Sequence, residues 1–143
     1  MKKEDKYSDY KKIYTNMCMI YKENGEILVE ERIKSDWPGL TFPGGHINDG
    51  EDLIEATKRE VFEETNLIID NVEYVDEIVW INEKKKTCEI ALLYRTNTYE
   101  GELKSSEEGP VFFIHYSDYK KYPLSTDFER VLDLMLNKPT KLF

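Results

Sequence analysis

The spacing of apolar and polar residues along the chain predicts mostly β-structure. Apolar, β-prone residues occupy 13–21 and return over 27–32, and the Asn24-Gly25 pair between them favours a hairpin turn. Comparable short apolar segments recur and are expected to be strands: 40–42, 67–69, 72–81, 87–96 and 111–115. Strands are therefore expected to supply most of the core.

Two segments show a helical pattern instead. Residues 51–65 contain neither Gly nor Pro and have an apolar side, and Asn66 follows at a position where helices commonly end. Apolar residues in 127–137 recur at helical spacing, and Thr126 with Glu129 matches a capping box. Strands and helices together predict an α+β fold.

The length and the charge limit the possible functions. The chain has 143 residues, which suits a polar lead-in over 1–12 and a single domain over 13–143. It carries 20 Lys+Arg against 29 Asp+Glu, a formal net charge of −9. Such a charge argues against binding to bulk nucleic acid or to an anionic membrane. If the ligand bears phosphate, something other than net charge has to hold it.

No targeting or cross-linking feature stands out. Cys18 and Cys88 form neither a disulfide framework nor the paired spacing of a zinc site. Residues 1–12 lack the apolar stretch of a secretory signal, and no run approaches the roughly 20 apolar residues of a membrane span. We therefore expect a cytoplasmic protein that does not enter membranes.

One segment places acidic residues at a spacing that indicates chemistry. Glu60, Glu63 and Glu64 stand at i, i+3 and i+4, so all three lie on one face of the predicted helix. Their mutual repulsion calls for a countercharge, which a hard divalent cation such as Mg²⁺ supplies. The alternative is a solvated helix face with Lys58 and Arg59 as surface partners. An EF-hand is excluded, because the ligand positions around Gly50 lack the required Asp and Glu.

The full spacing from Gly45 to Leu67 resembles the Nudix box of the Nudix hydrolases. That pattern is Gly, five residues, Glu, seven residues, Arg-Glu, an aliphatic residue, one residue, Glu-Glu, one residue, Gly and an aliphatic residue. This chain matches every specified position except Asn66, where the family has Gly. Asn tolerates the same left-handed turn, so we interpret Asn66 as structural. The resemblance implies an α/β/α sandwich around a mixed β-sheet.

The resemblance also implies roles for the box residues. Glu60, Glu63 and Glu64 would bind Mg²⁺, or Mn²⁺ in its place, together with the Gly44 carbonyl. Glu60 would also orient or deprotonate the attacking water. Arg59 would hold the glutamates by ion pairing, and Glu51 would be structural or weakly associated with the metal. The implied reaction is attack by water on a phosphorus of a nucleoside diphosphate linked to a further group.

Three residues outside the box are candidates on the same grounds. Glu107 and Glu108 precede the strand 111–115, where family members often place a glutamate that completes the metal site or acts as base. A solvated turn is the alternative. Arg32 ends the strand 27–32, where related enzymes carry an arginine that touches substrate phosphates; a surface arginine is the alternative here.

The substrate class follows from shorter stretches. Residues 15–19, 37–46 and 105–109 look like those of the bacterial group assigned as 8-oxo-dGTP diphosphatases, which release nucleoside monophosphate and pyrophosphate. Candidate substrate contacts are Gly45, His46, Tyr122 and Asp127, and Trp37 could close over the site. The alternatives are a structural role for His46, a core position for Tyr122 and a hydrophobic anchor for Trp37. The asparagine that reads the base in well-known relatives is absent from its matching place; Ser125, Thr126 and Asp127 are there instead.

Other functions in the same family stay open. The substrate could be ADP-ribose, a dinucleotide polyphosphate or the 5′ end of RNA, although the acidic composition disfavours RNA. A non-catalytic module that senses a nucleotide is a further alternative, but such modules tend to lose box glutamates, which this chain keeps. The partner is therefore expected to be a small nucleotide, bound by a monomer or a homodimer.

Overall fold

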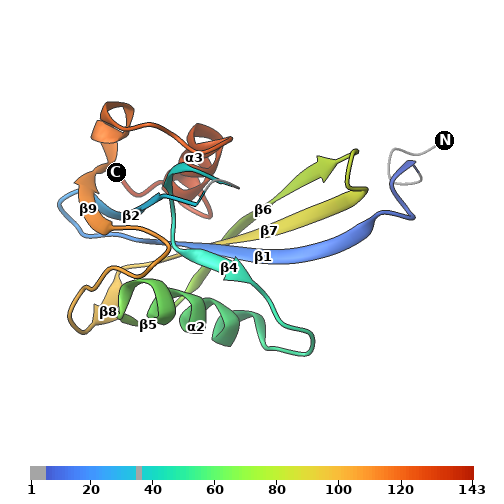
Figure 1. Cartoon of the computed structure of the whole chain (residues 1–143). Coiled ribbons are helices and arrows are strands. Elements are labelled where there is room, and N and C mark those ends of the chain that lie inside the picture. The colour runs from blue at the N-terminus through green and yellow to red at the C-terminus, as the bar shows by residue number, and fades with distance from the viewer. Residues whose placement is uncertain (1–5, 35–36) are drawn as a thin grey trace.

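The structure is a computed structural model that describes residues 6–34 and 37–143; residues 1–5 of the expected lead-in lie outside the described residues. Its elements are β1 (Lys11–Ile20), β2 (Glu26–Arg32), β3 (Gly39–Thr41), β4 (Gly44–His46), α2 (Leu53–Thr65), β5 (Ile68–Asp70), β6 (Glu73–Asn82), β7 (Thr87–Thr96), β8 (Thr98–Glu100), β9 (Val111–His115), the 3₁₀ helix η1 (Tyr116–Lys121) and α3 (Phe128–Asn137). Helix α2 lies on one side of the strands and α3 on the other (Figure 1). The predicted combination of helices and strands is confirmed.

The pleat of the strands sends alternate side chains to the two helices. In β1, Met19 packs into the core beside α3, whereas Cys18 and Ile20 pack into the core beside α2. In β2, Val29 faces α3 and Leu28 faces α2 in the same way. Both faces are therefore buried over residues 18–20 of β1 and 27–29 of β2, which explains why these two segments are continuously apolar.

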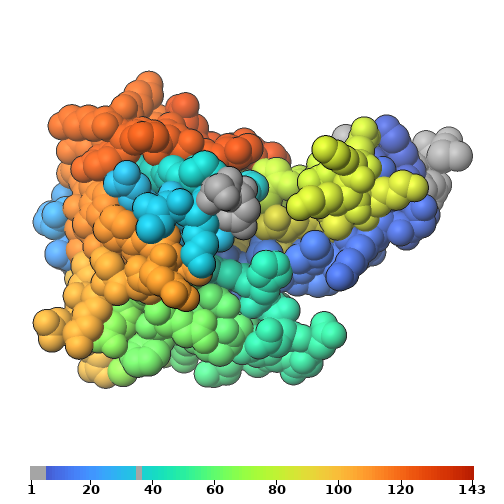
Figure 2. All heavy atoms as spheres, in the orientation of Figure 1, coloured from blue at the N-terminus to red at the C-terminus, as the bar shows by residue number. Residues whose placement is uncertain are grey.

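The strands form a mixed arrangement within the described residues. One sheet has the order β4-β1-β7-β6, another β3-β2-β9, and β5 pairs with β8. Strand β1 runs parallel to β7 over its whole length and antiparallel to β4. The start of β1, the end of β6 and the start of β7 project together from the body of the molecule as an arm (Figure 2).

The Asn24-Gly25 turn forms, but the predicted hairpin does not. Gly25 takes φ 91°, and Lys22 N–H donates to the Glu26 carbonyl across the turn at 2.8 Å. Beyond the single bridge between Tyr21 and Ile27, the two strands separate into different sheets. The reason is competition from distant partners, because β1 pairs with β4 and β7 while β2 pairs with β3 and β9.

Other element boundaries also differ from the sequence predictions. Strand β1 begins at Lys11, inside the expected lead-in, and β4, β8 and η1 were not predicted at all. The capping box at Thr126 and Glu129 is wrong. Asp127 is the N-cap of α3 at φ 67° and makes no side-chain bond to the helix amides. Its carboxylate instead accepts from Trp80 Nε1 at 2.9 Å. None of the helices in the described residues has the length and apolar character needed to cross a bilayer.

A buried arginine joins the sheet to the C-terminal segment. Arg95 of β7 is 1% exposed, and its guanidinium donates to Glu73 Oε1 at 2.7 Å and to the Met135 carbonyl of α3 at 2.9 Å. A third bond reaches Thr140 Oγ1 at 3.1 Å. Because a buried cation is tolerated only when its donors are satisfied, these three bonds hold α3 against the sheet.

Replacing Arg95 with Lys is expected to lower the free energy of unfolding by about 2–4 kcal/mol, because an ammonium cannot reproduce three diverging bonds. Urea titration at constant pH measures the change. The control is Arg130→Lys, since Arg130 is exposed and makes one ion pair to Asp127 at 3.3 Å; its effect should stay within about 0.5 kcal/mol. Equal losses in the two variants would contradict the role given to Arg95.

Candidate active site

Caps at both ends fix the helix that carries the three glutamates. The Asp52 carboxylate accepts from the Glu55 N–H at 3.0 Å, so α2 begins two residues later than the sequence pattern indicated. At the other end Asn66 takes the left-handed conformation with φ 66°, and its Nδ2 donates to the Glu102 carbonyl at 2.8 Å. These caps hold the glutamate face of α2 towards β4.

Two glycines bring β4 against both β1 and α2. Gly44 N–H donates to Glu64 Oε2 at 3.1 Å, and Gly45 N–H donates to Asn16 Oδ1 at 3.0 Å. A Cβ on Gly44 would collide with the Asn16 carbonyl, and one on Gly45 would collide with the Glu60 carboxylate. A side chain at Gly44 would therefore force the backbones of β4 and β1 apart, whereas one at Gly45 would displace the Glu60 carboxylate.

Arg59 gathers the neighbouring acidic groups. Its guanidinium donates to both carboxylate oxygens of Glu51, at 2.7 and 2.9 Å, to Glu60 Oε1 at 2.9 Å and to Glu63 Oε1 at 3.2 Å. A further bond reaches the His46 carbonyl at 3.2 Å. The bonds to Glu51 raise the pKa of Arg59 and lower the pKa of Glu51, so both stay ionised.

Glu64 lies beside a carboxyl group that the sequence analysis missed. Glu64 is 4% exposed and Glu30 of β2 is 1% exposed, and their carboxyl groups contact each other. Burial, followed by the contact with Glu30, raises the pKa of Glu64, and burial also raises the pKa of Glu30. The available signal was a glutamate directly after the apolar run 27–29 and in phase with the buried Leu28.

Glu60 occupies an intermediate environment. Burial raises its pKa above the ordinary value, and the hydrogen bond from Arg59 only partly opposes this effect. A carboxylate with a raised pKa is a stronger base, which suits a group that removes a proton from water near neutral pH. Glu63, by contrast, is about half exposed.

One cavity brings together most of the residues singled out from the sequence. Its volume is about 390 Å³, and it lies between α2, β4 and the loop before β9. The predicted residues that line it are Arg32, Gly44, Gly45, His46, Glu60, Glu63, Glu64, Glu107 and Glu108. At its edge Glu108 pairs with Arg32 at 3.3 Å, and it also pairs with Lys34 at 3.6 Å. The cavity therefore has an acidic wall and a basic edge.

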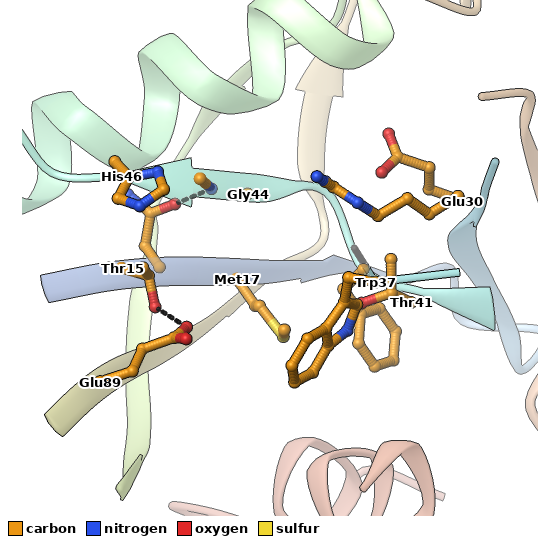
Figure 3. A pocket seen from close by; sticks show the side chains of 12 residues that line it. Thr15, Met17, Glu30, Trp37, Thr41, Gly44, His46 and Glu89 are labelled. Atoms are coloured by element: carbon orange, nitrogen blue, oxygen red, sulfur yellow. Dashed lines mark hydrogen bonds between the residues drawn. The ribbon is translucent and has the colours of Figure 1, made fainter. Parts of the chain in front are cut away.

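A second cavity of about 170 Å³ adjoins the first and has a different lining. The two share Arg32 and the Gly44–His46 strand, whereas Met17, Trp37 and Phe42 give the second an apolar surface. Its polar groups include a hydrogen bond from Thr15 Oγ1 to Glu89 Oε2 at 2.8 Å (Figure 3). An acidic and an apolar compartment thus meet at one strand.

Two predicted substrate contacts line neither cavity. Tyr122 packs against Phe112 with ring centroids 5.5 Å apart, next to the core beside α3. The Asp127 carboxylate is occupied by Trp80 and by Arg130. Trp80 in turn lies 5.4 Å from Trp37, ring centroid to ring centroid, so Asp127 is separated from the apolar cavity by a pair of indoles.

Comparison with known proteins places this geometry in a family. A sequence model of the NUDIX domain matches residues 12–134. The chain belongs to the Nudix family. No curated protein sequence matches it. The Nudix fold, an α/β/α sandwich around mixed strands, is confirmed along with the membership.

Solved Nudix structures show how widely the fold is shared. The MutT NUDIX hydrolase of Burkholderia pseudomallei is 19% identical with a TM-score of 0.78, covering 87% of this chain and 98% of that one. The ORF135 protein of E. coli is 23% identical with a TM-score of 0.76, covering 92% and 96%. The NUDIX domain of Shewanella oneidensis NrtR, solved with ADP ribose, is 14% identical with a TM-score of 0.71, covering 98% and 100%.

The acidic cavity has the donor chemistry of a cation site. Nudix hydrolases generally use divalent metal ions. In the described residues, no three His, Cys, Asp or Glu side chains already converge on a metal-sized position. However, Glu64 Oε1 and Glu30 Oε1 are buried without a hydrogen-bond donor. Buried carboxylate oxygens that lack a donor are the ligands that a hard cation takes, so the residues suit Mg²⁺ or Mn²⁺.

In the presence of a chelator, raising the pH from about 6 to 9 is expected to lower the free energy of unfolding. The folded protein keeps a proton on the Glu30–Glu64 pair, whereas unfolded glutamates release theirs near the ordinary pKa of 4.5. Because the folded state binds more protons above that pH, stability falls as the pH rises, by at most about 1.4 kcal/mol per pH unit for one proton.

Urea titration at stepped pH measures this slope, and Glu64→Gln should make it shallower. Glu63→Gln is the matched control, one residue earlier on the same helix and about half exposed. The same slope in the wild type and in Glu64→Gln would contradict the account of this carboxyl pair.

Proposed function

We propose that the protein is a Mg²⁺-dependent Nudix hydrolase that cleaves a nucleoside triphosphate to nucleoside monophosphate and pyrophosphate. The first candidate substrate is 8-oxo-dGTP, and Mn²⁺ should substitute for Mg²⁺. The observation that carries the proposal is the pair of adjoining cavities, one lined by carboxylates and the other by Met17, Trp37 and Phe42. A nucleotide has the same two parts, a polyphosphate and an apolar base.

The acidic cavity is assigned to the phosphates and the cation. Glu60, Glu63, Glu64 and the Gly44 carbonyl would hold Mg²⁺, which when bound neutralises phosphate charge and lowers the pKa of water. Arg59 keeps the Glu60 and Glu63 carboxylates in place through bonds of 2.9 and 3.2 Å. Glu60, whose pKa is raised by burial, would accept the proton of the attacking water.

The edge shared by the two cavities is assigned to the phosphates nearest the nucleoside. Arg32 lines both cavities, and His46 does the same from β4. A guanidinium suits this role because its planar donors can bind two phosphate oxygens at once. Glu108, which pairs with Arg32 at 3.3 Å, and Glu107 are the loop candidates for a second base or a further metal ligand.

The apolar cavity is assigned to the base. Trp37 and Met17 lie together beneath β4, and Glu89 is held by Thr15 at the same side (Figure 3). A carboxylate here can accept from base N–H groups. Guanine has an acceptor at N7, whereas its 8-oxo form has an N7–H donor, so an acidic group supports testing the oxidised base first.

Purified protein with Mg²⁺ is expected to release pyrophosphate from 8-oxo-dGTP, and Glu63→Gln should lower kcat/KM by about 100-fold or more through loss of a metal ligand. The panel also contains dGTP, other nucleoside triphosphates, ADP-ribose and capped RNA, with products resolved by chromatography. Preference for ADP-ribose or an unmodified nucleotide would contradict the assignment of 8-oxo-dGTP as substrate, but not the metal-dependent hydrolase activity. Undiminished turnover by Glu63→Gln would contradict the metal assignment.

Replacing Trp37 with Ala is expected to raise KM for the preferred nucleotide about 5- to 150-fold, since stacking a base on an aromatic ring contributes about 1–3 kcal/mol. Steady-state kinetics measures the change, and Trp37→Phe should restore most of the affinity. Mn²⁺ binding should be the same in both variants, because Trp37 does not line the acidic cavity. A fall in Mn²⁺ affinity in Trp37→Ala would contradict the division into two compartments.

A further inference from the structure

We propose that Glu30, which lies outside the Nudix box, is a further carboxylate ligand of the divalent cation and shares that ion with Glu64. This inference rests on the metal-dependent function proposed above. It concerns a residue of β2 that the box pattern does not contain, and it follows from burial, strand geometry and the balance of charges around the two carboxyl groups.

The pleat of β2 directs Glu30 towards α2, where it contacts Glu64; Glu64 lines the acidic cavity and Glu30 lines the adjoining smaller one. Leu28 and Glu30 are on the same face of the strand, and Leu28 packs into the core beside α2 together with Val61. Figure 3 shows the Glu30 carboxylate turned away from Trp37, on the side where α2 lies. Glu31, one residue later, is on the opposite face. Strand register therefore makes Glu30 the residue of β2 that meets Glu64.

The surroundings of Glu30 are short of positive charge. Its carboxyl contacts Glu64, and the carboxyl groups of Glu60 and Glu108 are also close to it. The attraction from Arg32 is the opposing charge, but Arg32 already pairs with Glu108 at 3.3 Å. The carboxylates near Glu30 therefore outnumber the cation that faces them.

One carboxylate oxygen of Glu30 and one of Glu64 receive no hydrogen bond from the protein. Glu30 Oε1 and Glu64 Oε1 are both buried and accept no hydrogen bond, while Glu64 Oε2 accepts from Gly44 N–H at 3.1 Å. If position 30 had only a packing role, an apolar side chain would fill it at lower cost, as Leu28 and Val29 do at their positions in β2. A cation between strand and helix would satisfy both open oxygens, since hard divalent ions take carboxylate ligands.

The test measures cation binding rather than turnover. Metal-free wild type, Glu30→Gln and Glu31→Gln are titrated with Mn²⁺, and free Mn²⁺ is counted by electron paramagnetic resonance. Glu30→Gln should weaken binding about tenfold or more through loss of a ligand, and Glu31→Gln should change it less than about twofold. Equal weakening in the two variants, or wild-type affinity in Glu30→Gln, would overturn the inference.

Thermal unfolding separates a ligand role from a structural one. In a chelator, Glu30→Gln should unfold at the wild-type temperature or above it, because one of two adjacent buried acids is gone, whereas added Mn²⁺ should raise its Tm less than that of the wild type. A lower Tm in the chelator combined with an unchanged Mn²⁺ gain would overturn the proposal. If Glu30→Gln does not fold, Glu30→Asp keeps the charge on a shorter side chain and should still show weakened binding.

The same titration distinguishes failure of this inference from failure of the proposed function. Glu63→Gln is included as a box variant. If the wild type binds Mn²⁺, Glu63→Gln binds it weakly and Glu30→Gln binds it normally, the box site stands and the role of Glu30 is wrong. If the wild type binds no Mn²⁺, the metal-dependent function is wrong, and the inference about Glu30 is overturned with it.

Discussion

The geometry of this site depends on a steric constraint: a stretch of backbone without side chains runs between β1 and α2. At Gly44 any Cβ would meet the Asn16 carbonyl, and at Gly45 it would meet the Glu60 carboxylate. Because the contact is this close, the amide of Gly44 reaches the Glu64 carboxylate directly. The missing side chain at Gly44 thus allows β4 to lie close to β1, and the one at Gly45 leaves space for the Glu60 carboxylate of the acidic wall.

Crowding acidic groups next to that wall creates an electrostatic problem that the protein solves only in part. Arg59 compensates Glu51, Glu60 and Glu63 with a single guanidinium at the solvent side. Glu30 and Glu64 lie deeper, where their carboxyl groups contact each other and Glu64 also accepts from Gly44 N–H. Part of the acidic excess that the composition shows as a net −9 thus gathers at this site, where a bound cation would offset it.

Local features were predictable from sequence, and contacts between distant segments were not. The spacing of Glu60, Glu63 and Glu64 places them on one face, because residues three and four positions apart are neighbours on the surface of a helix. Glu30 escaped notice because its relation to α2 arises from strand pairing across the fold. The predicted hairpin at Gly25 was wrong for the same reason, since remote strands compete for β1 and β2. Asp127 is likewise held by Trp80, 47 positions away in the chain.

The ion pair between Arg32 and Glu108 means that the guanidinium at the junction of the two cavities already has an anionic partner. A phosphate that binds Arg32 therefore has to compete with a carboxylate of the same protein. Binding at this point is an exchange of anions rather than a simple addition, so its free energy is the difference between two ion pairs. Such an exchange disfavours weakly charged anions and leaves the loop glutamate available to other partners once a polyphosphate has displaced it.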